Sequence, residues 1–277
     1  MGGGSRSRPP RKPRLRRLIT TACLAGAQGL GLAAPAEAGA WPQRRGEGLL
    51  IVTSLVDRAD HAYDGNRDSV DDGYFHKDET SAYVEYGLSN VDTLVARLAW
   101  QDVRRLRGAS HDEAQGLSAS EVGWRRVVWR SDRSLVAGQL TALIPGQGEN
   151  VSNQAFGSGE MAAEIRALAG RSFGDRVFVE GQLAWRWRDG DELDEARLDL
   201  TAGWRPADRW QVMAQSFSVW SAERDHPGAR SFDQHKLQVS VSRRIGRQTY
   251  QLGASITPTG RNAIDQRAVF LAVWRRF

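Results

Sequence analysis

The sequence predicts an all-β protein: a transmembrane, antiparallel up-and-down β-barrel of about twelve strands, preceded by a cleaved signal peptide. Three observations support this fold class. Apolar and polar residues alternate with a period of two through most of the chain, the connections alternate between short and long, and the basic excess lies in one N-terminal segment.

The composition excludes several other classes. The chain has 277 residues, of which 26% are charged and 40% are hydrophobic, so a disordered chain is not expected. The mean hydropathy is −0.50, and no uninterrupted apolar run reaches about 18 residues, which excludes a helical membrane protein.

The N-terminal segment predicts export. Seven basic residues precede residue 18, an apolar stretch follows to about residue 34, and Ala36-Glu37-Ala38 matches a cleavage site. We therefore expect a signal peptide over residues 1–38 and a barrel domain over 39–277. Cleavage would reduce the 38 basic and 33 acidic residues to 31 and 32. The net charge of the mature chain then no longer indicates nucleic-acid binding. A twin-arginine signal at Arg16-Arg17 and lipidation of Cys23 remain open.

Twelve strands follow from the alternation. In the clearest, residues 177–188, one face carries Val, Val, Gly, Leu, Trp and Trp, and the other carries Phe, Glu, Gln, Ala, Arg and Arg. The expected strands are 47–56, 80–88, 93–102, 118–129, 135–144, 160–172, 176–188, 196–205, 210–220, 234–244, 248–257 and 266–277. A soluble sandwich would alternate in the same way.

Connection lengths favour the membrane barrel. The short connections are 89–92, 130–134, 173–175, 206–209 and 245–247. The long, polar ones are 57–79, 103–117, 145–159, 189–195, 221–233 and 258–265. Outer-membrane barrels have short periplasmic turns, long extracellular loops and an even number of strands. The pattern thus predicts a bacterial outer-membrane protein with both termini in the periplasm.

Aromatic residues fit this interpretation. Six tryptophans lie near predicted strand ends, as in an aromatic girdle: Trp100, Trp129, Trp187, Trp204, Trp210 and Trp220. The last strand ends on Phe277, which predicts an assembly signal for the barrel-assembly machinery. Arg275 departs from that signal, because an apolar residue is usual at its position.

Charged residues recur on the strand face that should line the lumen. They are Glu85, Arg97, Glu121, Glu164, Arg166, Glu180, Arg186, Arg188, Arg197, Asp199 and Lys236. We expect Arg186 to lie opposite Arg197 or Asp199, with Glu164 on its other side. Four arginines against three carboxylates on one wall predict weak anion selectivity. A narrow, partly plugged pore and a closed barrel both remain open, because twelve strands lie between filled and open barrels.

No catalytic residue, metal site or cofactor is predicted. The acidic run from Asp64 resembles a calcium loop, but Ser69 and Phe75 replace its required glycine and glutamate. His235 has Ser218 and Ser240 on nearby segments, although no motif connects them.

Several short segments resemble one family. They are Gly39-Ala40-Trp41-Pro42, Gly46-Glu47-Gly48, Phe75-His76-Lys77-Asp78-Glu79, the run from Tyr83 to Leu88, and Gly260-Arg261-Asn262. Together they resemble the XagA-like proteobacterial outer-membrane barrels, which are associated with exopolysaccharide and biofilm loci. The resemblance covers mainly residues 39–100 and supplies no catalytic residues.

These observations predict a transport or export channel for a polysaccharide or a small charged solute. The alternative is a structural or adhesive surface barrel without a conducting pore. The expected partners are outer-membrane lipid, lipopolysaccharide, the barrel-assembly machinery and a polysaccharide.

Overall fold

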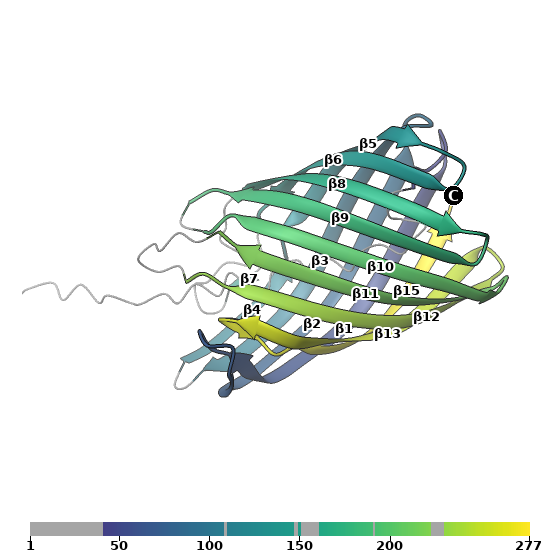
Figure 1. Ribbon diagram of the computed structural model, residues 1–277. Coiled ribbons are helices and arrows are strands. Elements are labelled where there is room, and N and C mark those ends of the chain that lie inside the picture. The colour runs from purple at the N-terminus through teal and green to yellow at the C-terminus, as the bar shows by residue number, and fades with distance from the viewer. Residues whose placement is uncertain (1–40, 108–109, 147–148, 151–160, 191, 223–229) are drawn as a thin grey trace, which may run out of the picture.

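The computed structural model describes residues 41–107, 110–146, 149–150, 161–190, 192–222 and 230–277. The predicted signal peptide and its cleavage site after Ala38 lie outside these residues. Within them, no helix is long and apolar enough to cross a membrane. All the regular structure is β-strand, and Figure 1 shows the strands slanting around one barrel.

Twelve antiparallel strands form the wall, which confirms the predicted fold class. They are β1 (Gly48–Tyr63), β2 (Ser69–Gly87), β3 (Asp92–Arg107), β5 (Ser120–Arg130), β6 (Ser134–Ile144), β8 (Ala162–Phe173), β9 (Val177–Arg188), β10 (Glu195–Ala207), β11 (Trp210–Ser221), β12 (Asp233–Ile245), β13 (Gln248–Arg261) and β15 (Arg267–Arg276). Pairing of β1 with both β2 and β15 closes the barrel, so its backbone groups are satisfied within the wall.

The two ends of the barrel differ, as the sequence predicts. The turn end carries the short connections, the start of β1 and the end of β15, and the loop end carries the other connections (Figure 1). Short turns of outer-membrane barrels face the periplasm, and the location of the turn end on that side stays a prediction.

Three of the predicted long loops are wrong, because much of each is strand. In residues 258–265, the first four continue β13 and Ala263–Ile264 form β14. Residues 57–79 continue β1 and β2 to a tight turn at residues 64–68, where the Asp64 carboxylate accepts hydrogen bonds from the backbone of Asn66 and Asp68. Residues 103–117 contain the end of β3 and β4 (Ser110–Leu117), which pair with each other. The outer face of these extensions carries polar residues such as His76 and Arg104, and the inner face mixes charged residues with Phe75 and Val103. The alternation that identifies the wall strands is therefore missing there.

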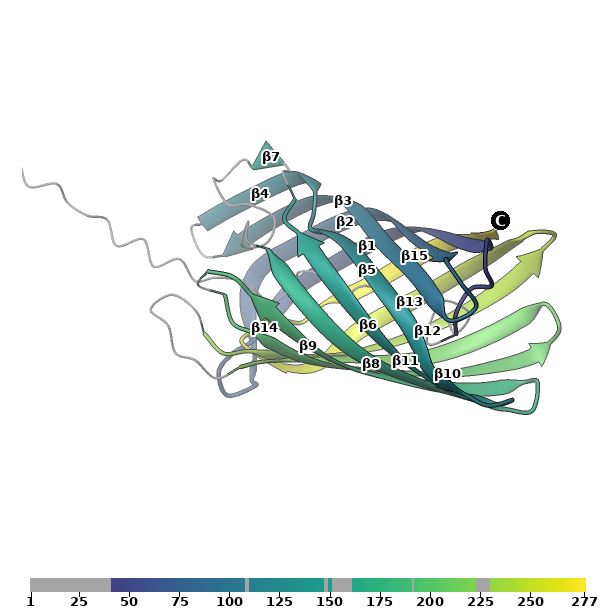
Figure 2. The same cartoon turned by 90° about the horizontal axis from the view of Figure 1, so that it is seen from above.

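Two further strands are only two residues long. They are β7 (Glu149–Asn150), which pairs with β4, and β14 (Ala263–Ile264), which pairs with the end of β1. Figure 2 shows β4 and β7 at the end of the barrel opposite the C-terminus.

The alternation separates the two faces of the wall. On β12, Leu237, Val239 and Val241 are exposed on the outside, whereas Gln238 and Ser240 are buried inside. The six tryptophans expected near strand ends are all exposed, by 37 to 54%. They lie toward both ends of the barrel, as an aromatic girdle requires.

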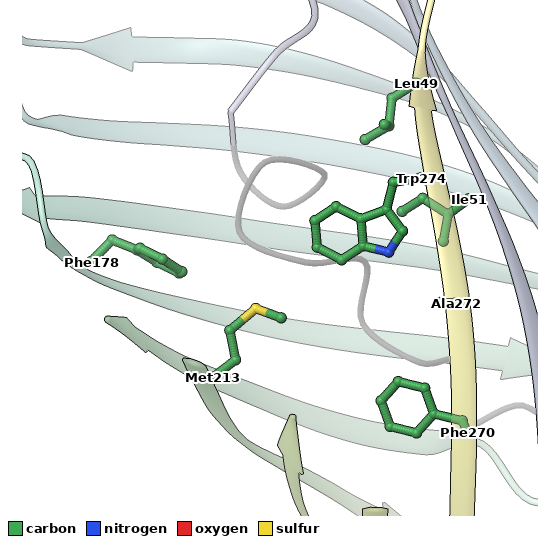
Figure 3. Packing of buried hydrophobic residues seen from close by; sticks show 7 residues of the cluster. All are labelled: Leu49, Ile51, Phe178, Met213, Phe270, Ala272 and Trp274. Carbon is green, nitrogen blue, oxygen red and sulfur yellow. The ribbon is translucent and has the colours of Figure 1, made fainter. Parts of the chain in front are cut away.

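An apolar cluster on the inner side of the turn end is not predicted by the sequence. It contains Leu49, Ile51, Phe178, Met213, Phe270, Ala272 and Trp274. Figure 3 shows Phe178 and Met213 pointing toward the side chains on β15. Gly203 and Gly253, which pair directly with Phe178 and Phe270, leave room for the two rings against the wall.

Candidate functional site: the barrel lumen

The eleven residues predicted to line the lumen all lie on the strand face opposite the exposed apolar side chains. Each is buried or partly buried. Ten of them come from β2, β3, β5, β8, β9 and β10, and we call the inner side of these strands the charged wall. The other, Lys236 on β12, has its Nζ 4.0 Å from the carboxylate of Asp57.

Glu85 is the centre of the first group of charges. Its side chain is fully buried, and Oε1 accepts hydrogen bonds from Arg125 Nη1 at 2.8 Å and from the Tyr83 hydroxyl at 2.7 Å. The other oxygen accepts a bond from Gln43 Nε2 at 2.8 Å. Arg125 was not predicted as a lumen residue, although it lies four residues after Glu121 on the same face of β5.

Glu79 is a second carboxylate with several donors. It accepts hydrogen bonds from Arg97 Nη2 and Gln101 Nε2, both at 2.6 Å, and pairs with Lys77 at 3.4 Å. Arg97 also lies 3.8 Å from Glu121. Glu79 falls within residues 57–79, which were expected to form a loop, so it was not predicted as a lumen residue.

Glu164 is the centre of another group of charges on the charged wall, on β8, β9 and β10. It is directly opposite Arg186 in the register of β8 and β9, and the two side chains are 2.7 Å apart. Arg166 donates to the other Glu164 oxygen at 2.8 Å and also reaches Asp199 at 2.5 Å. The position of Glu164 beside Arg186 therefore agrees with the expected register.

The expected partners of Arg186 on β10 are wrong. Arg186 is directly opposite Glu195, and Arg197 is opposite Ala184. Glu195 accepts hydrogen bonds from Arg188 and Arg197, both at 2.7 Å. The sequence assigned residues 189–195 to a loop, so this carboxylate was left out of the expected pairing.

The added carboxylates change the charge balance of this part of the wall. Arg188 also pairs with Glu192 at 2.5 Å. The four arginines at residues 166, 186, 188 and 197 thus accompany five carboxylates, at residues 164, 180, 192, 195 and 199. The small cation excess from which we expected anion selectivity is not present here.

Uncharged polar residues line the facing side of the lumen, on β10 to β13. We call this side the neutral wall and define it by Thr201, Gln215, Gln238, Ser240 and Gln251. Gln238 donates to Gln215 at 2.8 Å, Gln215 to Thr201 at 3.2 Å, and Gln251 to Ser240 at 2.9 Å. Apart from Lys236 on β12 and its partner Asp57 on β1, the lumen is therefore charged on one side and neutral on the other.

Residues 41–47, which we call the mouth segment, enter the lumen at the turn end. Trp41 packs against a cluster that includes the inward-facing Leu135 and Leu168, and Gln43 is bonded to Glu85. Gly87 makes this approach possible, because a Cβ there would lie 2.1 Å from the backbone oxygen of Arg44.

A cavity of about 580 Å³ remains beside the mouth segment. Its lining includes Trp41, Phe178, Arg133, Arg205 and Arg276. The mouth segment thus occupies part of the turn-end opening and leaves a vestibule next to it.

His235 lies near Ser218 and Asp233 on the outer side of β11 and β12. Its Nδ1 is 2.9 Å from Ser218 Oγ, and its Nε2 is 3.6 Å from Asp233 Oδ1. The Asp233 carboxylate accepts two bonds from Arg67 at 2.7 Å. This carboxylate connects the β1–β2 turn to β12, and no hydrolase function is inferred from the cluster.

Phe277 lies where the barrel closes. Its backbone N–H donates to the Gly48 carbonyl at 3.0 Å, and Gly48 N–H donates back to Phe277 at 2.8 Å. The ring covers Gly48, since a Cβ there would lie 2.4 Å from it. The role of Phe277 as an assembly signal stays a prediction.

Comparisons with known proteins agree on the fold. No protein-family model and no curated protein matches the chain. Among solved structures, the COG4313 outer membrane channel from Pseudomonas putida F1 matches with a TM-score of 0.74 and 13% identity, over 88% of this chain and 99% of that one.

Two further structures show the same architecture. The translocator domain of autotransporter NalP from Neisseria meningitidis matches with a TM-score of 0.58 and 13% identity, over 85% of this chain and 90% of that one. KdgM porin in complex with oligogalacturonate matches with a TM-score of 0.51 and 9% identity, over 82% and 99%. The chain therefore has the fold of outer-membrane β-barrels, and the known examples of this fold include channels, porins and a translocator.

Proposed function

We propose that the protein is a narrow, charge-lined outer-membrane channel for a small charged solute or an oligosaccharide. The observation that carries this proposal is the charged wall, where carboxylates and guanidinium groups from successive strands point into the lumen. Such a wall gives a hydrated path whose field acts on charged solutes.

A purely structural role, in which the ion pairs only fill the barrel interior, is a weaker explanation of the charged wall. Replacement of buried ion pairs by well-packed apolar residues is often neutral or stabilising, because burying charges costs desolvation energy. The cluster around Phe178 and Trp274 shows that this barrel holds apolar residues inside where it needs packing. The paired charges elsewhere favour a polar pathway.

Two comparisons bear on the substrate class. The sequence resembles barrels associated with exopolysaccharide loci, and KdgM porin, which has a similar barrel, is described in complex with oligogalacturonate. Both favour a saccharide as the solute. A closed structural barrel is the second candidate, because the mouth segment occupies the turn-end opening and most charges of the wall are paired.

The mouth segment supplies the test. In Gly87→Ala, the new methyl group would meet the backbone of residues 43 and 44, which cannot rotate away, so the segment must leave its position. We expect a several-fold increase in single-channel conductance in planar bilayers. The combined change Trp41→Ala and Gln43→Ala removes the contacts of the segment and should give the same increase.

Gly138→Ala is the matched control, because nothing lies within 4 Å of a Cβ at Gly138. Its conductance should equal that of the parent. Folding of each variant is checked by heat-modifiable migration on gels. If the parent and both mouth-segment variants fold but do not conduct, the channel is rejected and the structural barrel is retained.

A further inference from the structure

The turn end of the barrel is strongly basic. Thirteen arginines of the described chain are exposed there: Arg44, Arg45, Arg126, Arg130, Arg133, Arg171, Arg176, Arg209, Arg243, Arg244, Arg247, Arg275 and Arg276. The acidic side chains at the same end are Glu47, Asp92, Asp132, Asp175 and Asp208. This end therefore carries a large excess of positive charge.

Three of these arginines stack on aromatic rings of the outer surface. The guanidinium carbon of Arg126 lies 5.9 Å from the ring centre of Trp124, that of Arg171 lies 5.3 Å from Phe173, and that of Arg243 lies 5.0 Å from Trp210. The pairs lie on β5, β8 and the β11–β12 hairpin. They are therefore spread around the barrel.

The aromatic partners fix the depth of these charges. Rings of an aromatic girdle lie at the level of the lipid headgroups. A guanidinium stacked on such a ring is held at the level of the lipid phosphates, to which it can donate two parallel hydrogen bonds. The three stacks therefore present positive charge to lipid and not to the lumen.

The carboxylate partners of the three arginines are few. Arg126 lies 3.3 Å from Asp92 and its side chain is still 55% exposed. Among the described residues, no carboxylate lies within 4.0 Å of Arg171 or Arg243. These side chains are available to an external anion.

The loop end has a different outer surface. Its exposed tryptophans include Trp100, Trp187 and Trp220, and no arginine of the described chain stacks on them. Outward arginines do occur there, but Arg58 and Arg104 pair with aspartates at 2.8 and 3.2 Å. The stacked arginines are thus a property of the turn end.

We propose that Arg126, Arg171 and Arg243 form a binding surface for the phosphate headgroups of anionic phospholipid in the periplasmic leaflet. Positive charge, the bidentate geometry of arginine and the depth of the aromatic girdle all match such a headgroup. This surface lies outside the lumen and does not depend on the proposed channel.

The test compares lipid affinities by quenching of tryptophan fluorescence. The whole barrel is reconstituted in mixtures of brominated phosphatidylglycerol and phosphatidylcholine, and the outward tryptophans, which include Trp124 and Trp210, report the lipid beside them. Each arginine near an anionic surface contributes about fivefold in affinity. We therefore expect the parent to prefer phosphatidylglycerol by at least about fivefold at low ionic strength, and the preference should decrease as salt is added.

The triple variant Arg126→Gln, Arg171→Gln and Arg243→Gln should bind both lipids almost equally. The matched control changes three outward arginines of the loop end to glutamine and should keep the preference of the parent. They are Arg58, Arg104 and Arg267, the last of which begins β15 and has a 75% exposed side chain. If the turn-end glutamine variant fails to fold, the triple lysine variant and the single Arg243→Gln variant replace it. The lysine variant should keep most of the preference, and Arg243→Gln should lose part of it.

Two results would overturn the proposal. One is a parent that binds the two lipids equally, whether or not it binds a soluble polyanion such as heparin. The other is a folded turn-end glutamine variant that keeps the full preference for phosphatidylglycerol.

Discussion

The charged and neutral walls face the same lumen but are held together in different ways. On the charged wall, Glu85, Glu79 and Glu164 each accept bonds from two or more donors, including at least one cation. On the neutral wall, Gln238 and Gln251 make single hydrogen bonds to their neighbours. Loss of one charged member leaves a buried charge behind, whereas loss of one amide leaves a neutral group, so the two walls should differ in their response to substitution.

Both walls require closure of the barrel between β1 and β15, so the largest effect is expected there. Deletion of Phe277 removes the reciprocal bonds with Gly48 and exposes unpaired backbone groups, which cost several kcal/mol each in lipid. We expect a strong loss of assembled barrel, measured by heat-modifiable migration in outer-membrane fractions. Deletion of Gly228, in the predicted loop 221–233, should lower the yield much less, and Phe277→Tyr should assemble normally. Equal yields for the two deletions would contradict the role of Phe277.

The charged wall should respond next most strongly. Glu85→Ala leaves the buried guanidinium of Arg125 without its carboxylate, and such losses cost about 3–5 kcal/mol. Gln215→Ala on the neutral wall removes ordinary hydrogen bonds and should cost about 1 kcal/mol. Urea unfolding of the reconstituted proteins measures both. Similar losses in the two variants would show that the walls do not differ as described.

The stability of the apolar cluster should depend on how closely its side chains fit together. In Gly203→Ala, the added Cβ would lie 1.8 Å from the ring of Phe178, which is itself buried. The ring or the strand must shift, and overpacking of this kind costs about 1–3 kcal/mol. Gly138→Ala is the control, because its Cβ meets nothing within 4 Å. A Gly203→Ala barrel as stable as this control in urea would show that the ring moves without cost.

Ion selectivity should shift by the smallest amount. Replacing Arg186 and Arg188 by serine leaves two arginines beside five carboxylates, so we expect the reversal potential in a salt gradient to shift toward cations. Glu164 keeps Arg166, and Glu195 keeps Arg197, so folding should survive. Changing Gln215 and Gln238 to serine alters no charge and should leave the reversal potential unchanged. An unchanged potential in the arginine variant of a conducting barrel would place these residues away from the ion path.

The sequence by itself determined the architecture of this protein. Alternation of period two separates an apolar outside from a polar inside, as in Leu237 and Gln238, because adjacent strand residues point to opposite faces. Connection lengths located the turn end, and the six exposed tryptophans marked the girdles. Each of these features is local in the chain, so no knowledge of contacts is required to read it.

Only the tertiary structure decided which charges meet. The register places Arg186 opposite Glu195 and not Arg197, and a shift of one residue would have changed every partner across the strand pair. The hydrogen bond from the mouth segment to Glu85 joins residues 42 positions apart. The stacking of Arg243 on Trp210 joins the end of β12 to the start of β11, at the far end of the two strands from their connection. Such contacts depend on closure of the whole barrel. The order and pairing of the strands in the barrel, and not the separation of two residues in the chain, determine how far apart the residues lie.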